Sequence, residues 1–392
     1  MKILWLASWY PTEVSPYNGD FIQRHAKAAA LINEVELLYV EKDDEGRITK
    51  DVTEITRTHG QLTERIIYYK PFKTSIKLID RFLSGLKYKR IYRAAVKNYI
   101  NVNGKPAFIH VHIAMKAGLT AMWLKKKFNI PYIISEQWGG YMDTAKPNIK
   151  DYNAVYRHYW KEIFKEALTC TFVSVELGKI IKQKFNINSG RVIPNVVDTD
   201  IFFPVQKKNS SQVRFIHIST MTYQKNTEAI LEALHLLKDE LSFRIDLFGT
   251  MNPVLQQLIS KLQLGDKVFV MGEVPQTELA RYVQWSDALI LYSRYETFGC
   301  VLIEANACGI PVIVSDLPVF HELIKEGENG IFAEGNNANA LAEKIRMFIM
   351  QKDSFNKQLI AETTMAKYNF QKAAKQFDDL YKELSAGIQH IQ

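Results

Sequence analysis

Two glutamates stand eight positions apart in the stretch Ser293–Ala305, which holds the most informative chemistry in the chain. The stretch follows an apolar run and is expected to open a helix, with Glu296 in the turn and Glu304 about two helical turns later. Free N–H groups at a helix start attract phosphate, and Gly299 allows close backbone approach. The two carboxylates could accept hydrogen bonds from hydroxyls of a sugar and of a ribose. The alternative is that both glutamates are solvated residues on a helix surface.

The next ten residues, 307–316, contain a Gly that ends the helix, then a Pro and a buried strand. The whole arrangement resembles the retaining glycosyltransferases of family four, which have the GT-B fold. Their signature is a Glu, seven residues and a second Glu, with Phe-Gly after the first and a Gly-x-Pro-Val strand behind. By this resemblance Glu296 contacts the donor sugar and Glu304 the ribose. Backbone N–H groups then face the sugar and phosphates at Thr297, Phe298 and Gly299.

Two motifs of the first half fit the same resemblance. Gly19 lies in Pro16–His25, which resembles the family's Gly loop beside the diphosphate, although one Gly alone is typical of an ordinary turn. His110 and His112 form a His-x-His at a strand end, with both rings on one strand face. That pattern also suits a metal, but no third ligand stands at metal spacing. By resemblance His112 lines the donor-sugar pocket, His110 supports it, and neither metal nor cofactor is expected.

The loop Ser219–Asn226 is where relatives grip the diphosphate with an Arg and a Lys. Lys225 matches the Lys, whereas Thr220 stands where Arg is common. One of the two cationic side chains that bind the diphosphate in relatives is therefore missing, and Arg294 is the candidate to replace it. The alternative for Lys225 is a solvated loop lysine.

Three more donor-binding positions follow from the resemblance. Gly249 matches a strand-end turn, and Val274 lies in the loop whose backbone cups the nucleobase. Asn195 belongs to the hinge motif Pro-Asn-x-x-Asp, although Val196 replaces the Gly that is common after the Asn.

The stretch 135–141 is the candidate acceptor site. Aromatic faces stack on the C–H surfaces of sugars, and two aromatic residues stand here beside two polar ones: Glu136, Gln137, Trp138 and Tyr141. The alternative is a packed loop with two buried aromatics.

The elements that must position these residues are short apolar runs that alternate with helical stretches. Nearly continuous apolar runs are typical of parallel strands covered on both faces, and repeated βα units of doubly wound α/β sheets. The strands are expected at Lys2–Ser8, Val35–Val40, Arg65–Lys70, Phe108–Ile113, Tyr132–Ser135, Thr171–Val175, Arg214–Ser219, Arg244–Phe248, Lys267–Met271, Ala288–Tyr292 and Val312–Ser315. Helices are expected at Phe21–Leu31, Gly118–Phe128, Thr227–Lys238, Glu278–Trp285 and Asn339–Gln351.

We therefore expect two Rossmann-like domains facing across a cleft, the GT-B arrangement, with ligands at the carboxyl ends of the strands. Residues 1–193 form the acceptor domain, completed by a C-terminal helix at 371–392, and residues 194–370 form the donor domain. The polar stretch 207–212 is expected to be a linker.

Composition agrees with a soluble two-domain protein. The 392 residues exceed one ordinary core, and 47% are hydrophobic and 23% charged. No run approaches the ~20 apolar residues of a membrane span, and the chain start lacks the pattern of a signal peptide. Three cysteines form no CxxC pair, which indicates a reducing compartment. We expect a cytoplasmic protein, or one peripheral to the inner face of a membrane.

The net charge of +8 is divided unevenly. Residues 1–195 carry +13 and residues 196–392 carry −5. Much of the surplus lies in 73–97, a basic amphipathic stretch with a helical pattern that could lie on an anionic membrane. The alternative is that its apolar face packs on its own domain. No nucleic-acid recognition pattern accompanies the charge, so nucleic acid is not expected as a partner.

The function that these residues predict is a retaining, hexosyltransferase-type glycosyltransferase. Its donor is a nucleotide sugar, with UDP expected before GDP, and its acceptor is a glycan or lipid-linked saccharide of surface polysaccharide or glycoconjugate biosynthesis. Two alternatives stay open. One is a nucleotide-sugar 2-epimerase of the same fold, and the other is a non-catalytic nucleotide-binding or membrane-scaffold module.

Overall fold

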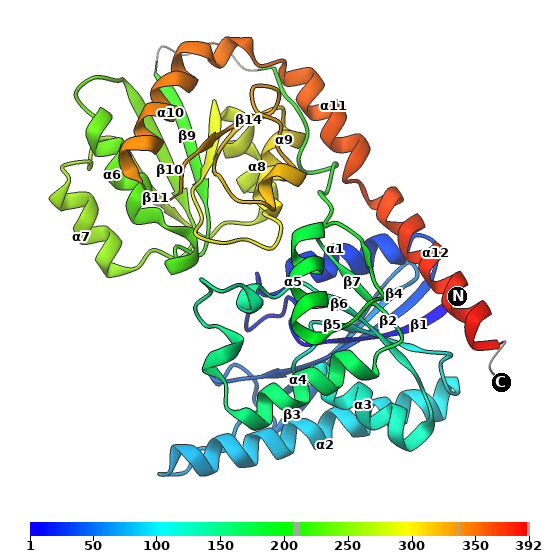
Figure 1. The fold of residues 1–392 in the computed structure, drawn as a ribbon. Helices are drawn as coiled ribbons and strands as arrows, with labels where there is room; N and C mark the ends of the chain where they lie inside the picture. Colours follow the sequence, from blue (N-terminus) through cyan, green and yellow to red (C-terminus); the bar gives the residue numbers. More distant parts are fainter. Residues whose placement is uncertain (207–211, 336, 390–392) are drawn as a thin grey trace.

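The computed structural model describes residues 1–206, 212–335 and 337–389, which form two α/β domains (Figure 1). Each domain is built on a largely parallel sheet covered by helices on both faces. This confirms the predicted fold class. Most of the linker expected at 207–212 lies outside the described residues.

The first sheet has eight strands in the order β3-β4-β2-β1-β5-β6-β7-β8, and all pairs are parallel except β3 with β4. Its strands are β1 (Lys2–Ala7), β2 (Glu34–Lys42), β3 (Val52–His59), β4 (Leu62–Tyr69), β5 (Ile109–His112), β6 (Tyr132–Glu136), β7 (Cys170–Phe172) and β8 (Arg191–Val192). Sequence analysis missed β3, a mostly exposed edge strand, and β8, which has two residues.

Strand β1 shows why the central strands have apolar residues at nearly every position. Ile3 and Trp5 pack with one layer of helices, whereas Leu4 and Leu6 pack with the opposite layer. Both faces are buried, so no position is left for a polar alternation. The helices of this domain are α1 (Asp20–Ala29), α2 (Lys77–Asn103), α3 (Ala117–Phe128), α4 (Ala154–Glu166) and α5 (Val175–Phe185).

The final helix, α12 (Phe370–Gln389), returns to the first domain and packs beside α1 (Figure 1). Tyr381 from α12 lies in the same apolar layer as Trp5, and the Trp5 Nε1–H donates to its hydroxyl at 3.1 Å. The chain's last helix therefore completes the core around β1.

The second sheet has six parallel strands in the order β11-β10-β9-β12-β13-β14. They are β9 (Val213–Ile218), β10 (Phe243–Phe248), β11 (Val268–Gly272), β12 (Ala288–Leu291), β13 (Val312–Ser315) and β14 (Gly330–Ala333). The helices are α6 (Thr227–Leu237), α7 (Pro253–Lys261), α8 (Gln276–Trp285), α9 (Cys300–Ala307), α10 (Ala338–Gln351) and α11 (Lys357–Lys367).

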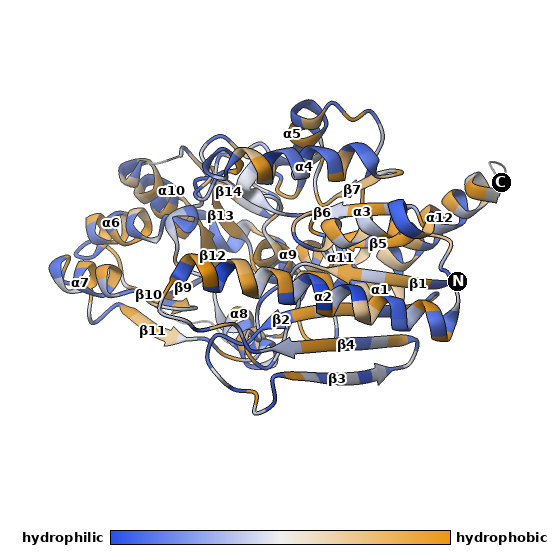
Figure 2. Ribbon diagram, turned by 90° about the horizontal axis from the view of Figure 1, so that it is seen from below, coloured by the Kyte–Doolittle hydropathy of each residue, from blue (hydrophilic) through white to orange (hydrophobic). Residues whose placement is uncertain are grey.

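Helix α2 is unusual because its two halves have different surroundings. Tyr92, Val96 and Tyr99 of the second half are buried in the core, whereas Leu78 and Phe82 of the first half are exposed. Figure 2 shows α2 on the outer side of the first domain with hydrophobic and hydrophilic residues intermixed. None of the helices in the described ranges is long and apolar enough to cross a membrane.

Candidate active site between the two domains

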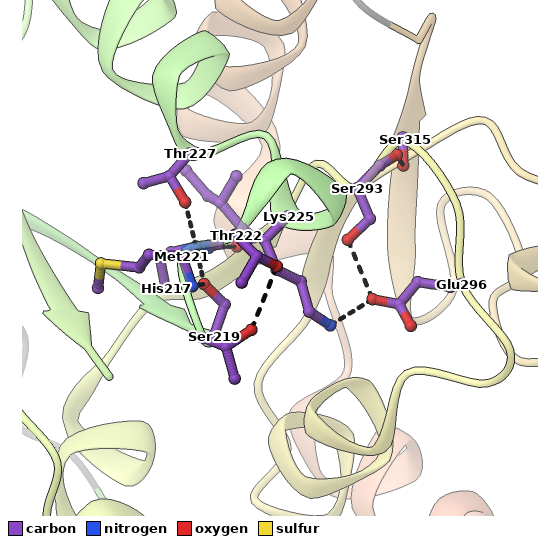
Figure 3. A network of polar contacts seen from close by, with 11 residues as sticks. His217, Ser219, Met221, Thr222, Lys225, Thr227, Ser293, Glu296 and Ser315 are labelled. Carbon is purple, nitrogen blue, oxygen red and sulfur yellow. Dashed lines mark hydrogen bonds and ion pairs between the residues drawn. The ribbon is translucent and has the colours of Figure 1, made fainter. Parts of the chain in front are cut away.

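Glu296 and Lys225 form an ion pair where β9 and β12 end side by side (Figure 3). Glu296 is only 5% exposed, and its Oε1 also accepts a 3.1 Å hydrogen bond from Ser293 Oγ. These residues meet because adjacent parallel strands present their carboxyl ends at one edge of the sheet. A cation and an anion therefore stand within reach of one ligand.

A hydrogen-bonded network supports the loop that carries Lys225 (Figure 3). His217 lies 2.8 Å from the Ile290 carbonyl through Nδ1 and 2.8 Å from Ser219 Oγ through Nε2. Burial lowers the pKa of His217 to about 4, so the ring is neutral near pH 7. A carbonyl only accepts, so Nδ1 carries the proton and Nε2 accepts from Ser219. Ser219 Oγ in turn accepts from the Met221 N–H. Sequence analysis missed His217 because its role depends on a neighbouring strand.

Arg294 braces the same loop. Its guanidinium donates to the Tyr223 carbonyl at 2.6 Å and pairs with Glu228 at 2.7 Å. Thr220 is exposed and supplies no charge. The Arg294 guanidinium therefore holds the loop in place through these two contacts, and its predicted contact with a phosphate stays a prediction.

The start of α9 presents backbone N–H groups at this edge. Gly299 is the N-cap residue with a left-handed backbone, and the Phe298 side chain is buried against Tyr368. Within the described part of the chain, no hydrogen-bond partner is found for the N–H groups of Thr297, Phe298 and Gly299. Such unpaired donors, with the partial positive charge of the helix start, are suited to an anion.

Glu304 pairs with Arg24 of α1, so this contact joins the two domains. Arg24 Nη1 lies 2.7 Å from Glu304 Oε1, and both side chains are buried. Arg24 also pairs with Asp20, which accepts a 3.1 Å hydrogen bond from Gln276 of the second domain. Burial raises the pKa of Glu304, and Arg24 acts against that shift. Sequence analysis did not single out Arg24, although the residue lies within the motif around Gly19.

His112 ends β5 and is completely buried, with its ring stacked on Trp5 at a centroid distance of 3.8 Å. Burial lowers the pKa of His112 well below the usual range, and the neighbouring His110 adds to this shift. His110 bonds to the Tyr381 hydroxyl and to Ser135 Oγ, each at 2.7 Å. Neither ring nitrogen of His112 has a hydrogen-bond partner among the described residues. A buried polar group without a partner is costly, which marks His112 as a candidate ligand contact.

Two glycines bring loops close to the sheet edges. Gly19 precedes α1 with φ of 73°, and a Cβ there would lie 2.9 Å from the Trp9 carbonyl carbon. Gly249 follows β10 with φ of 124°, and a Cβ would lie 1.7 Å from the Ser219 carbonyl oxygen. Both positions therefore require Gly. Val274 lies half-buried after β11.

Asn195 is buried in the connection between the domains, and its Oδ1 has no hydrogen-bond partner among the described residues. Its neighbour Val196 is also buried, and the Val196 carbonyl accepts from Arg24 Nη1 at 3.2 Å. The predicted hinge therefore lies beside the charged network that joins the domains.

The acceptor platform expected at 135–141 is wrong for Glu136 and Tyr141. Glu136 is buried and accepts from three backbone N–H groups and from the Tyr141 hydroxyl at 2.9 Å. Tyr141 is only 1% exposed, so no face is free to stack on a sugar. These contacts make the residues structural, as the packed-loop alternative proposed. Trp138 is half-buried and stacked on Trp160 at 5.0 Å.

Gln137 differs from its neighbours, because its buried Nε2 has no partner among the described residues. The same loop touches the donor-domain loop. A Cβ at Gly139 would lie 3.4 Å from the Tyr295 ring and 3.6 Å from Thr297. In the described ranges, no group of three or more His, Cys, Asp or Glu side chains could hold a metal ion.

Two family models match the chain in succession. The model for family 4 glycosyltransferases matches residues 50–201, and the model for group 1 glycosyl transferases matches residues 198–364. An uncharacterised glycosyltransferase of Methanocaldococcus jannaschii is 26% identical over 86% of this chain and 89% of its own length. A Bacillus subtilis glycosyltransferase, TuaC, named for teichuronic acid biosynthesis, is 22% identical over 98% of this chain and 99% of its own.

Solved structures share the fold along the whole chain. Sucrose-phosphate synthase from Thermosynechococcus elongatus superposes with a TM-score of 0.80 at 19% identity, covering 99% of this chain and 100% of its own. Anabaena HepE superposes with a TM-score of 0.69 at 15% identity, covering 98% and 100%. With two consecutive family models and full-length neighbours in agreement, the chain belongs to the group 1 glycosyltransferases and has the GT-B fold.

Proposed function

We propose that this glycosyltransferase uses a nucleoside diphosphate sugar, UDP before GDP, and transfers the sugar with retention to a hydroxyl of a glycan or lipid-linked saccharide. The observation that carries the proposal is the Lys225–Glu296 pair beside the free N–H groups at the start of α9. A nucleotide sugar has an anionic diphosphate, which a cation and free N–H groups can bind. It also has a sugar ring rich in hydroxyls, which a carboxylate can bind.

The names of similar proteins support this choice. HepE was solved in complex with UDP and glucose and in complex with UDP-glucose. WaaB is a lipopolysaccharide outer core galactosyltransferase, and RfbU of Salmonella typhimurium is an O-antigen chain mannosyltransferase. Together with TuaC, these names favour surface polysaccharide or glycoconjugate biosynthesis for this chain as well.

In the proposed reaction, the bond between the anomeric carbon and the diphosphate oxygen breaks, and the acceptor oxygen bonds to the same face of the sugar. The acceptor proton passes to a phosphate oxygen of the leaving group, so no enzyme nucleophile and no metal ion are needed. Lys225 and the N–H groups before α9 stabilise the negative charge that develops on the diphosphate.

The sugar is oriented by groups from both domains. Glu296 accepts hydrogen bonds from hydroxyls, and neutral His112 offers one nitrogen as donor and the other as acceptor. Both residues are buried, so the reacting centre is shielded from water, which limits hydrolysis of the donor.

The test is turnover of a panel of nucleotide sugars by wild type and Glu296→Ala, read as release of nucleoside diphosphate in the presence of acceptor. We expect transfer to fall about 100-fold or more, as when a transition-state contact is lost. Glu328→Ala is the control, because that carboxylate is exposed and remote from the pair. Equal rates for wild type and Glu296→Ala would contradict the role of Glu296. If the protein converts the donor into its 2-epimer in the absence of acceptor, it is the 2-epimerase. If it binds nucleotide sugars without turning them over, it is a non-catalytic module.

We also propose that residues 73–97 bring the enzyme to an anionic membrane surface. The support is the exposed, basic and partly apolar first half of α2. A membrane location suits an acceptor that is lipid-linked.

A further inference from the structure

A groove of about 740 Å³ lies between the first half of α2 and helices α3 and α4. Two of its lining residues, Lys42 and Tyr69, are the last residues of β2 and β4, and Lys116 immediately precedes α3. Parallel strands β2, β4 and β5 end at the same edge of the first sheet, and His112 is the last residue of β5. One end of the groove therefore reaches the sheet edge that carries His112.

The groove is strongly cationic, with eight basic and two acidic side chains in its lining. Both acids are engaged, because Asp44 pairs with Lys42 and Asp80 accepts from the Thr74 N–H. Within the described residues, no ion pair involves the side chains of five basic residues: Lys73, Lys77, Arg81, Lys89 and Lys126. Like charges gathered without counter-charges repel one another, so an anion bound here would stabilise the groove.

Lys116 and Lys42 show this crowding directly. Partial burial lowers the pKa of Lys116, and the neighbouring Lys42 ammonium lowers it further. The Lys116 ammonium lies 5.7 Å above the Tyr88 ring. Glu41 and Asp44 act in the opposite direction, and the Lys116 pKa is nevertheless lowered.

The first half of α2 also has a row of exposed apolar residues, each of which directly follows a groove-lining residue in the sequence. Leu78, Phe82 and Leu86 follow one another at four-residue spacing and are 76%, 66% and 47% exposed. In Figure 1 this half of α2 extends beyond the rest of the first domain at the lower left. Tyr156 and Tyr159 of α4 add aromatic surface to the groove itself. Exposed apolar surface of this kind, next to cations, indicates a ligand with apolar and anionic parts.

We propose that the groove binds the diphosphate group and the adjoining isoprenoid units of a polyprenyl diphosphate-linked saccharide, the acceptor of the reaction. This inference rests on the proposed function and specifies its acceptor class. The unpaired cations hold the diphosphate, the apolar row of α2 contacts the lipid, and the saccharide extends toward the edge at His112. A soluble anionic glycan would satisfy the cations but would leave the exposed row of leucine and phenylalanine without a purpose.

The test is calorimetric binding to the full-length protein of geranylgeranyl diphosphate, geranylgeraniol, inorganic diphosphate and an oligogalacturonate. We expect geranylgeranyl diphosphate to bind at least 10-fold more tightly than each of the other three probes. Lys77→Gln/Arg81→Gln should weaken its binding about 10-fold or more. The matched control, Lys179→Gln/Lys375→Gln, removes two exposed lysines of α5 and α12 that form no ion pair in the described chain and should leave the affinity unchanged.

Unchanged affinity in Lys77→Gln/Arg81→Gln would overturn the proposal. So would oligogalacturonate binding as tightly as the lipid diphosphate, which would make a soluble polyanion the occupant. Affinity for UDP is measured on the same variants and should not change, because the groove lies outside the donor site. If the wild-type protein bound the lipid diphosphate but neither bound UDP nor turned over nucleotide sugars, the proposed function would be contradicted. The assignment of the groove would still hold.

Discussion

The proposed donor site and the groove of the first domain are both rich in cations, but their charges are arranged in opposite ways. In the donor site Lys225 pairs with Glu296, Arg294 with Glu228 and Arg24 with Glu304. In the groove most lysines have no anionic partner within the described chain. The paired site is held in shape by its own side chains, whereas the groove would gain charge compensation from an anionic ligand.

This difference has a consequence for binding. A diphosphate that enters the donor site competes with Glu296 for Lys225, and a ribose that reaches Glu304 meets a carboxylate already bound to Arg24. Binding there exchanges one partner for another, so its net gain depends on geometry. Binding in the groove only adds attraction, so it should be more sensitive to salt.

The largest effect is expected for the buried pair between the domains. Arg24→Met should lower the free energy of unfolding by about 3 kcal/mol at pH 7, because Glu304 is left buried without its cation. Burial raises the pKa of Glu304, so the carboxyl takes up a proton on folding once Arg24 is gone. A raised carboxyl pKa destabilises the folded state above the unfolded value of about 4.5, and the penalty disappears as the pH falls toward that value.

Chemical denaturation at pH 7 and pH 5 measures this loss, which should be smaller at pH 5. Arg57→Met is the matched control, because Arg57 pairs with Glu13 on the surface, where a salt bridge contributes less than about 1 kcal/mol. An equal loss in both variants would show that the Arg24–Glu304 pair does not stabilise the contact between the domains.

The next effect separates the two members of the donor-site pair. Lys225→Ala should weaken UDP binding about 10-fold or more, because a charged contact worth about 2 kcal/mol is lost and Glu296 then faces the diphosphate. Glu296→Ala should leave UDP affinity equal or tighter, since it frees Lys225. Calorimetry with UDP measures both, with Lys261→Ala as a control on α7. If both variants weakened UDP binding equally, the expectation that Lys225 strengthens UDP binding while Glu296 does not would be contradicted.

The smallest effect is expected at the exposed row of α2. Phe82→Ser/Leu86→Ser should reduce cosedimentation with anionic phospholipid vesicles by about 3-fold to 10-fold, because little apolar area enters the interface. Leu236→Ser on α6 is the matched control, with 49% of the residue exposed against 47% for Leu86. Equal binding to neutral and anionic vesicles would contradict an electrostatic contribution from the lysines of α2.

Much of the fold was predictable because buried parallel strands have a strong local pattern. All eleven expected strands are present, with ends shifted by a few residues at most. The missed strand β3 is exposed at a sheet edge, so its sequence has no apolar run to distinguish it from a loop. Strand β8 has only two residues, too few for a recognisable pattern, and β14 has four residues that include a glycine.

The candidate site was predictable where local sequence determines local structure. The Glu296–Glu304 stretch indicated a turn and a helix start, and both are present. For the loop at 135–141 the sequence left an acceptor platform and a packed loop as alternatives, because the same aromatic residues can face solvent or the core. Burial of Tyr141 and its bond to Glu136 depend on Trp160 and on the N–H groups around 114, far away in the sequence.

The sequence by itself determined the family, the alternation of strands and helices and the positions of the main donor-site candidates, because these depend on residue type and short spacing. Only the tertiary structure decided which charges are paired. Arg24 and Glu304 are 280 positions apart and meet through the packing of two domains, while the lysines of α2 are left without partners because that half of the helix stands away from the core. Pairing is a property of distance in space, which local sequence patterns do not encode.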